Sequence, residues 1–155
     1  MKYKAYSWLS IHCSSKRIWR LFQKHVPDFT TTRQRTDLGI LNFDIEANLT
    51  DLFDWNTKQL FLYLTCEYVT PKNKINQVVL WDKIVLRENL NDGVLEIKGA
   101  NPEYYFFDDG SFLRNTPANL TLSWNVIPNA GYMPTFESSN AFTFVFPKDY
   151  STPKI

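Results

Sequence analysis

Residues 41–49 read LNFDIEANL, and this stretch indicates the fold class. Its apolar side chains occupy every second position from Leu41 to Leu49, and the positions between them hold Asn, Asp or Glu. A period of two places all the apolar side chains on one face of an extended strand. A helix would spread the same side chains around its axis. We therefore expect a β-strand with one buried face here.

Further strands are expected after this one. Residues 58–69 (KQLFLYLTCEYV) are apolar on both faces near their centre, and residues 76–87 are rich in β-branched side chains, so both suit central strands of a packed sheet. Other candidate strands are residues 94–98, 103–107, 118–127 and 141–146. Turn clusters rich in Pro, Asn, Asp and Gly separate them. About seven short strands spaced in this way predict an all-β, antiparallel β-sandwich.

The size and composition describe one globular domain. The chain has 155 residues, 44% of them hydrophobic, and a formal net charge of +1. The charge balance lacks the basic excess of most nucleic-acid-binding domains, so no nucleic-acid partner is expected. The five glycines form no phosphate-binding loop of the GxGxxG or GxxxxGK type. No stretch is apolar enough for a membrane span or a cleaved signal peptide.

The charge is unevenly distributed along the chain. Residues 1–27, which we call the basic arm, contain six Lys or Arg and no acid, whereas the remaining 11 basic and 16 acidic residues give the rest a net charge of −5. Apolar residues of the arm recur at helical spacing, which predicts an amphipathic helix: Trp8, Ile11, Ile18, Phe22 and Val26. Three interpretations stay open for the arm: a membrane-surface helix, an organelle transit segment or an incorrect start of the sequence. The expected organisation is the arm, a β-sandwich over residues 28–150 and a tail over residues 151–155.

The inventory of side chains argues against catalysis by the sandwich. Both histidines, His12 and His25, lie in the arm, so a Ser/His/Asp or Cys/His mechanism within residues 28–155 is excluded. A Ser/Lys pair stays open, although the spacing singles out none of Ser111, Ser123, Lys83 and Lys98. We expect no catalytic residue, no metal and no cofactor.

Two further motifs have competing interpretations. Asp108 and Asp109 could hold a cation, but with Gly110 after them they are more typical of a turn. Cys66 continues the alternating apolar face of residues 60–68 and is expected to be a buried, inert thiol. Cys13 lies in the arm, and two cysteines so far apart predict neither a zinc site nor a particular disulfide.

Two sequons allow N-glycosylation if the chain enters the secretory pathway. They begin at Asn48 and Asn119, each followed by Leu and Thr. In the expected strands both asparagines, with their threonines, lie on the polar face. Both are therefore acceptable glycan sites.

Four longer motifs resemble one family. They are residues 53–63 (FDWNTKQLFLY), 76–86 (NQVVLWDKIVL), 105–110 (YFFDDG) and 122–131 (LSWNVIPNAG). In order and separation they are similar to the third, accessory subunits of the endoplasmic-reticulum signal peptidase complex. The resemblance runs over residues 28–150.

The resemblance implies a noncatalytic glycoprotein subunit that supports the catalytic subunit as signal peptides are removed. It implies a single-pass type II protein of the endoplasmic-reticulum membrane with a signal-anchor helix and a luminal sandwich. The partners are then the catalytic and other accessory subunits and the membrane, with no small-molecule ligand. The arm stands where the family has its anchor, and we expect that the start of the sequence is incomplete or misjoined. The alternative is a soluble β-sandwich binding module outside the lumen, a diverged copy without a peptidase role.

The same resemblance singles out particular residues. Three tryptophans and two aspartates of the motifs are expected to pack the sandwich or to contact another subunit: Trp55, Trp81, Trp124, Asp108 and Asp109. Family members carry a sequon just before the strand that reads LSW here. Asn119 is the nearest match, displaced by about two residues, and Asn48 is the second candidate.

Overall fold

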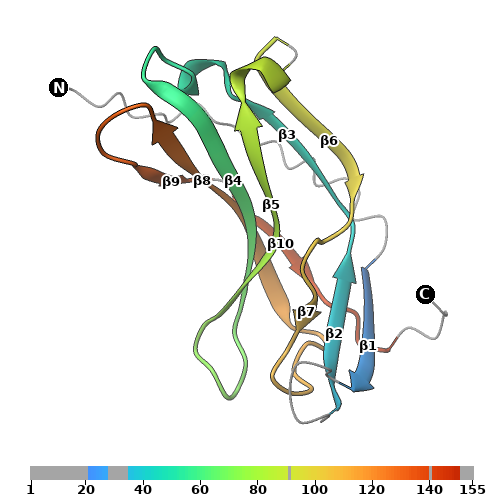
Figure 1. The fold of residues 1–155 in the computed structure, drawn as a ribbon. Helices are drawn as coiled ribbons and strands as arrows, with labels where there is room; N and C mark the ends of the chain where they lie inside the picture. Colours follow the sequence, from blue (N-terminus) through green and yellow to red (C-terminus); the bar gives the residue numbers. More distant parts are fainter. Residues whose placement is uncertain (1–20, 28–34, 91, 140, 151–155) are drawn as a thin grey trace.

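The computed structural model describes residues 21–27, 35–90, 92–139 and 141–150. These residues form an antiparallel β-sandwich of two layers, which confirms the expected fold class (Figure 1). One layer is a five-stranded sheet in the order β10-β8-β4-β5, with β9 paired to β8. Its strands are β4 (Thr57–Tyr68), β5 (Asn76–Leu86), β8 (Pro117–Pro128), β9 (Thr135–Glu137) and β10 (Phe142–Val145).

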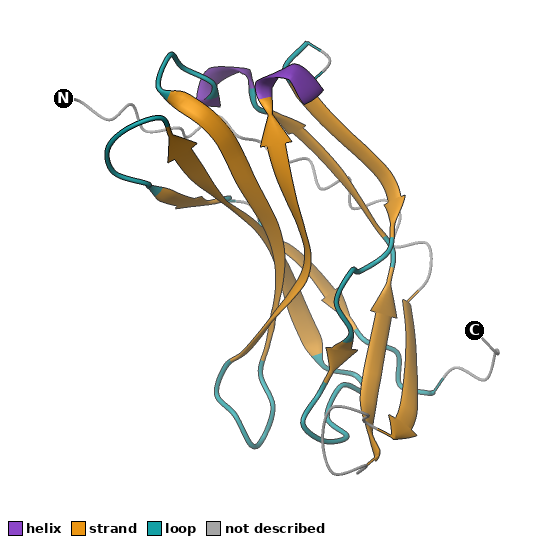
Figure 2. Cartoon of the chain, viewed as in Figure 1, coloured by secondary structure: helices purple, strands orange, loops and turns teal. Residues whose placement is uncertain are grey.

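The other layer consists of two smaller sheets. Three strands pair in the order β1-β2-β7: β1 (Leu21–Pro27), β2 (Arg35–Leu41) and β7 (Phe106–Phe107). Two more pair with each other: β3 (Phe43–Asn48) and β6 (Val94–Ala100). Two short 3-10 turns, η1 (Thr50–Leu52) and η2 (Arg87–Asn89), lie together at one end of the sandwich (Figure 2).

The alternating stretch at residues 41–49 forms the inner face of this smaller layer. β2 and β3 follow each other with only Asn42 between them. The five apolar side chains of the stretch are at most 2% exposed: Leu41, Phe43, Ile45, Ala47 and Leu49. The period of two therefore predicted both the strand and its buried face.

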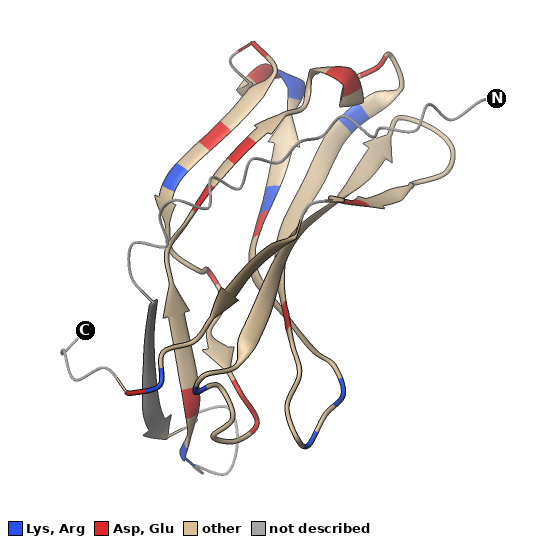
Figure 3. Cartoon of the chain, turned by 180° about the vertical axis from the view of Figure 1, so that it is seen from behind, with Lys and Arg blue, Asp and Glu red and all other residues tan. Residues whose placement is uncertain are grey.

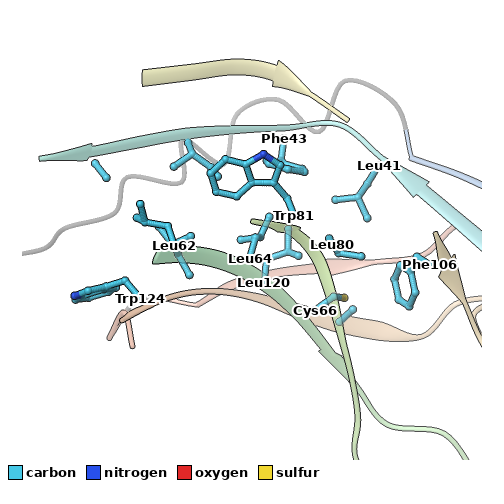
Figure 4. Close-up of a cluster of buried hydrophobic side chains, with 14 of the residues drawn as sticks. Leu41, Phe43, Leu62, Leu64, Cys66, Leu80, Trp81, Phe106, Leu120 and Trp124 are labelled. Carbon is cyan, nitrogen blue, oxygen red and sulfur yellow. The ribbon is translucent and has the colours of Figure 1, made fainter. Parts of the chain in front are cut away.

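β4 is the central strand of the larger sheet. It pairs along its length with β5 on one side and with β8 on the other. Leu60, Leu62 and Leu64 project from β4 into the core and are at most 3% exposed. Across the core the rings of Phe43 and Trp81 meet edge to face at 6.3 Å between centroids (Figure 4).

The basic arm differs from the expectation where it is described. Residues 21–27 form β1, paired antiparallel with β2 from Leu21 opposite Leu41 to Pro27 opposite Arg35, so the helix prediction is wrong for this part. The ladder with β2 supplies backbone hydrogen bonds that the spacing of a few apolar residues could not reveal. The rest of the arm, residues 1–20, and the tail lie outside the described residues. The division into arm, sandwich and tail stays a prediction.

The remaining differences concern short strands. β9, with three residues, was not expected, and only Phe106–Phe107 of the strand predicted at 103–107 is extended and paired. The reason is that the N–H groups of Glu103 and Tyr104 both donate to the carbonyl oxygen of Leu80, at 2.8 and 3.2 Å, outside any ladder of β7. Within the described ranges no helix has the length and hydropathy needed to cross a bilayer.

The connection into β6 depends on a tight turn. Asp92 and Gly93 both have left-handed backbone conformations, with φ of 53° and 76°. The carbonyl oxygen of Gly93 accepts a hydrogen bond from the N–H of Leu49 at 2.8 Å. A Cβ at position 93 would lie 2.0 Å from Oγ1 and 3.2 Å from Cα of Thr50. Glycine is therefore required at this position by conformation and by space.

We expect Gly93→Ala to destabilise the fold more than Gly99→Ala. Both glycines have a positive φ, so each substitution costs about 1–2 kcal/mol of conformational strain. Only position 93 adds an overlap with Thr50, worth a further 1–3 kcal/mol or so, because a Cβ at position 99 meets nothing within 4 Å. Urea unfolding of both variants measures the difference. Equal free energies of unfolding would contradict the contact with Thr50.

Candidate functional site

The structure does not bring a Ser/Lys pair together. Ser123 lies on β8 in the larger sheet, whereas Lys98 lies on β6 in the other layer and forms an ion pair with Glu96. Among the described residues, neither Ser111 nor Ser123 has a hydrogen bond to Lys83 or Lys98. No nucleophile is activated by these lysines in this arrangement.

Two buried carboxylates instead close one end of the sandwich. Asp37 on β2 is fully buried, and Asp108 after β7 is 2% exposed. Their backbones are linked, since the N–H of Asp108 donates to the carbonyl oxygen of Asp37 at 2.9 Å. Tyr68 donates its hydroxyl to Oδ1 of Asp108 at 2.9 Å, and Tyr150 donates to Oδ1 of Asp37 at 2.8 Å. We call these four residues the aspartate corner.

Backbone donors complete the aspartate corner. The N–H of Phe112 donates to Oδ2 of Asp108 at 3.1 Å, and that of Leu113 donates to Oδ2 of Asp37 at 3.2 Å. A buried carboxylate is tolerated only when such donors replace water. The corner therefore joins β2, β4, the segment after β7 and the end of the described chain.

The tyrosines of the aspartate corner act as donors. Burial and the adjacent charge of Asp108 raise the pKa of Tyr68 well above its usual value. Burial and the hydrogen bond to Asp37 likewise raise the pKa of Tyr150. Both hydroxyls thus stay protonated and keep donating, which suits a structural network.

Asp108 and Asp109 do not share a site. Asp109 points to the surface, where Lys72 Nζ lies 2.9 Å from its Oδ2 and Asn73 Nδ2 lies 3.3 Å from it. The hydrogen bond from Lys72 lowers the pKa of the Asp109 carboxyl. The described part of the chain contains no group of three or more His, Cys, Asp or Glu side chains able to hold a metal. The two carboxylates therefore face different partners in the bend after β7.

Cys66 has the environment of an inert thiol. It is fully buried on the inner face of β4 (Figure 4). Burial raises the pKa of the thiol to about 12, so almost no thiolate forms at neutral pH. Cys13 lies outside the described residues.

The motif tryptophans have contrasting environments. Trp81 and Trp124 are 5% and 1% exposed and belong to the core, where Trp124 stacks on Phe136. Trp55 is 85% exposed in the turn before β4. The neighbouring Asn56 holds that turn, because its Nδ2 donates to the carbonyl oxygen of Ala130 at 2.9 Å. Trp55 therefore contributes little to the packing of the sandwich.

Both sequon asparagines are on the surface. Asn48 ends β3, and its Oδ1 accepts a hydrogen bond from the N–H of Thr50 at 3.0 Å. Asn119 is exposed on β8, where its Oδ1 accepts from Thr143 Oγ1 at 2.8 Å. Thr121, the threonine of the second sequon, was expected on the polar face of its strand. In the structure its side chain is only 5% exposed. In both sequons the amide nitrogen that would carry a glycan is not the atom used in these bonds.

An aromatic groove that the sequence did not predict lies on the outer face of the larger sheet. Its volume is about 470 Å³, and it is lined by Phe61, Tyr63, Val79, Asp82, Tyr104 and Asn125. The signal was present in residues 58–69, whose centre is apolar on both faces. One of these faces builds the core, and the other lines the groove.

Comparison with known proteins identifies the family. Residues 5–149 match the family described as signal peptidase subunit. The chain is 52% identical over 137 residues to signal peptidase complex subunit 3 of Drosophila melanogaster, covering 88% of this chain and 75% of that protein. It is 52% identical over 136 residues to the human protein of the same name, covering 87% and 74%. The chain belongs to the signal peptidase subunit family.

The family match is longer than the resemblance seen in the motifs. It begins at residue 5, so it takes in most of the basic arm as well as β1. A further relative, adipocyte-related X-chromosome expressed sequence 1 of Mus musculus, is 50% identical over 133 residues, covering 84% of this chain and 72% of its own length. The aspartate corner as far as Asp108 and the whole aromatic groove lie within the region shared with the signal peptidase subunit family.

We expect Tyr68→Phe to lower the free energy of unfolding by about 1–3 kcal/mol. The substitution keeps the ring but removes the hydroxyl that donates to the buried carboxylate of Asp108. Tyr105→Phe is the matched control, since Tyr105 is 80% exposed and should change stability little. Chemical denaturation of both variants provides the test. A Tyr68→Phe protein as stable as the control would show that the aspartate corner does not need this donor.

Proposed function

We propose that this chain is the noncatalytic accessory subunit of the endoplasmic-reticulum signal peptidase complex. In that role it supports the catalytic subunit in removing signal peptides from nascent proteins. The observation that carries the proposal is the identity of 52% to proteins named signal peptidase complex subunit 3, over nearly nine-tenths of the chain. The alternative of a soluble module outside the lumen is not favoured by this similarity.

Two properties support a noncatalytic role. The sequence from residue 28 onward contains no histidine, so the sandwich lacks the base of a Ser/His/Asp mechanism. The buried polar groups at the aspartate corner are engaged in structural hydrogen bonds. The contribution of the chain is then positional. A rigid sandwich that holds the catalytic subunit at a defined place near the membrane makes cleavage an oriented step.

The proposal places the sandwich in the lumen of the endoplasmic reticulum, with a type II orientation. Asn48 and Asn119 are both exposed, as luminal glycan sites require. Asn119, three residues before the LSW motif on β8, is the proposed glycan carrier. The partners are the catalytic and other accessory subunits and the membrane.

Trp55 is the motif residue best placed to contact another subunit. Its side chain is 85% exposed, whereas Trp81 and Trp124 are buried in the core. A large aromatic side chain on the surface gains much from burial at an interface. Trp81 and Trp124 then act through packing in the core, and Asp108 acts through the hydrogen bonds of the aspartate corner. Asp109 sits at the surface with Lys72, outside the core.

Copurification tests the assignment. We expect the tagged full chain, expressed in place of the endogenous subunit, to recover signal-peptide cleavage activity from detergent-solubilised microsomes. The tagged chain purified away from other subunits should cleave nothing, because it supplies no catalytic groups. A tag fused to an unrelated luminal protein is the control. Recovery of the chain without the catalytic subunit, or cleavage by the isolated chain, would contradict the proposal.

Glycosylation tests the orientation. We expect endoglycosidase H to increase the gel mobility of the endogenous protein from microsomes. Asn119→Gln should abolish this shift, and Asn48→Gln should leave it in place. If neither substitution nor the enzyme alters mobility, the luminal placement is wrong. If Asn48→Gln alone abolishes the shift, Asn119 is not the carrier.

A further inference from the structure

The aromatic groove is an exposed binding surface built from three strands. Phe61 and Tyr63 of β4 stack at 5.7 Å between ring centroids and form its floor. In the sheet register, Ile84 of β5 and Asn125 of β8 flank Phe61 on its two sides. Ile84 is 54% exposed. Phe61 and Tyr63 alternate along β4 with the core residues at positions 60, 62 and 64, so they lie on the face of the sheet turned away from the core.

Tyr104 closes one side of the groove, and several bonds hold it in position. Its hydroxyl donates to Oδ1 of Asp82 at 2.8 Å. Its N–H and that of Glu103 donate to the carbonyl oxygen of Leu80 on β5. An aromatic wall fixed in this way loses little conformational freedom when it binds a partner.

The charged side chains that line the aromatic groove and its continuation are all acidic. A second depression continues along the same face past Tyr63 and Val79, and the two together are lined by the acids Asp82, Glu67 and Glu137. No Lys or Arg is among the lining residues. Lys83 follows Asp82 on β5, but it lies opposite the core residue Leu62 and does not line the groove. Two further lysines, Lys72 and Lys74, lie in the connection at the tip of the β4–β5 hairpin (Figure 3).

Asn125 adds an acceptor to this surface. It lines the aromatic groove, and its Oδ1 is buried without a hydrogen-bond partner among the described residues. A rotation of the Asn125 amide that brings this oxygen to the groove would let it accept from a ligand, and the cost of the unpaired acceptor would be removed. The groove thus has an aromatic floor, an acidic rim and an unpaired acceptor at Asn125. Together these features favour an occupant with an apolar side chain next to a cationic donor.

We propose that the aromatic groove is the docking site for a segment of another subunit of the peptidase complex, in which an apolar side chain stands beside a Lys or Arg. The inference rests on the proposed function, because it takes the partner from that complex. The apolar side chain lies over Phe61 and Tyr63, and the cation faces Asp82. Acidic lipid headgroups do not fit, because the rim would repel them.

A pair of lysine substitutions tests the proposal by copurification. Val79 in the groove and Val94 at the start of β6 are 41% and 39% exposed, so they are matched in size and exposure. We expect Val79→Lys in the full chain to reduce recovery of the complex by about tenfold, through a charge and a long side chain in the groove. Val94→Lys should recover as much as the unmodified chain. Resistance to trypsin shows that both variants are folded.

A crosslinking experiment identifies the occupant without a destabilising change. The photoreactive residue p-benzoylphenylalanine is placed at position 61 in the groove or, as control, at position 105, where Tyr105 is 80% exposed. We expect a crosslink from position 61 to another subunit, at a segment containing Lys or Arg next to an apolar residue. A crosslink to residues 1–20 of the same chain, to a second copy, or only to lipid overturns the proposal.

The two experiments separate the failure of this inference from that of the proposed function. Suppose that the unmodified chain and Val79→Lys recover the complex equally well and that no subunit is crosslinked at position 61. The chain is then a subunit of the complex, but the groove is not its docking site. If the unmodified chain recovers no complex, the proposed function fails and the inference fails with it.

Discussion

The pairing of β4 with β5 and β8 is the constraint on which the rest of the molecule depends. Backbone hydrogen bonds on both sides fix the register of β4 from Leu60 to Leu64, so alternate side chains of this part must point to opposite faces. Leu60, Leu62 and Leu64 then fill the core, and Phe61 and Tyr63 are placed together on the outside. A shift by one residue would exchange these two sets and remove both the core and the groove.

The aspartate corner shows how the second layer is joined to the first. Asp37 comes from β2 and Tyr68 from β4, and Asp108 links them through one backbone and one side-chain hydrogen bond. Buried carboxylates are costly, but each one here accepts from a tyrosine hydroxyl and a backbone N–H. Such a network favours a rigid body, which agrees with the proposed positional role.

Much of the fold was predictable because its signals are local. The alternation at residues 41–49 and the turn clusters located β3, β4, β5 and β8 closely. β1 was mistaken for helix, because a strand's partner is not visible in its own sequence. Asp108 and Asp109 lie in the bend between β7 and β8, in the segment to which the turn interpretation assigned them. The role of Asp37 was missed, since no pattern in its neighbours marks a charge whose partners lie far along the chain.

The sequence by itself determined the fold class, the buried faces of residues 41–49 and 60–68, the absence of histidine from residue 28 onward and the family. These follow from periodicity, composition and motif order, which are read along the chain. Only the tertiary structure decided that Asp108 turns inward while Asp109 turns outward, that Trp55 is exposed, and that Tyr104 closes a groove over Phe61. The physical reason is that these outcomes depend on which strands pair and pack, and that is settled by contacts between distant residues.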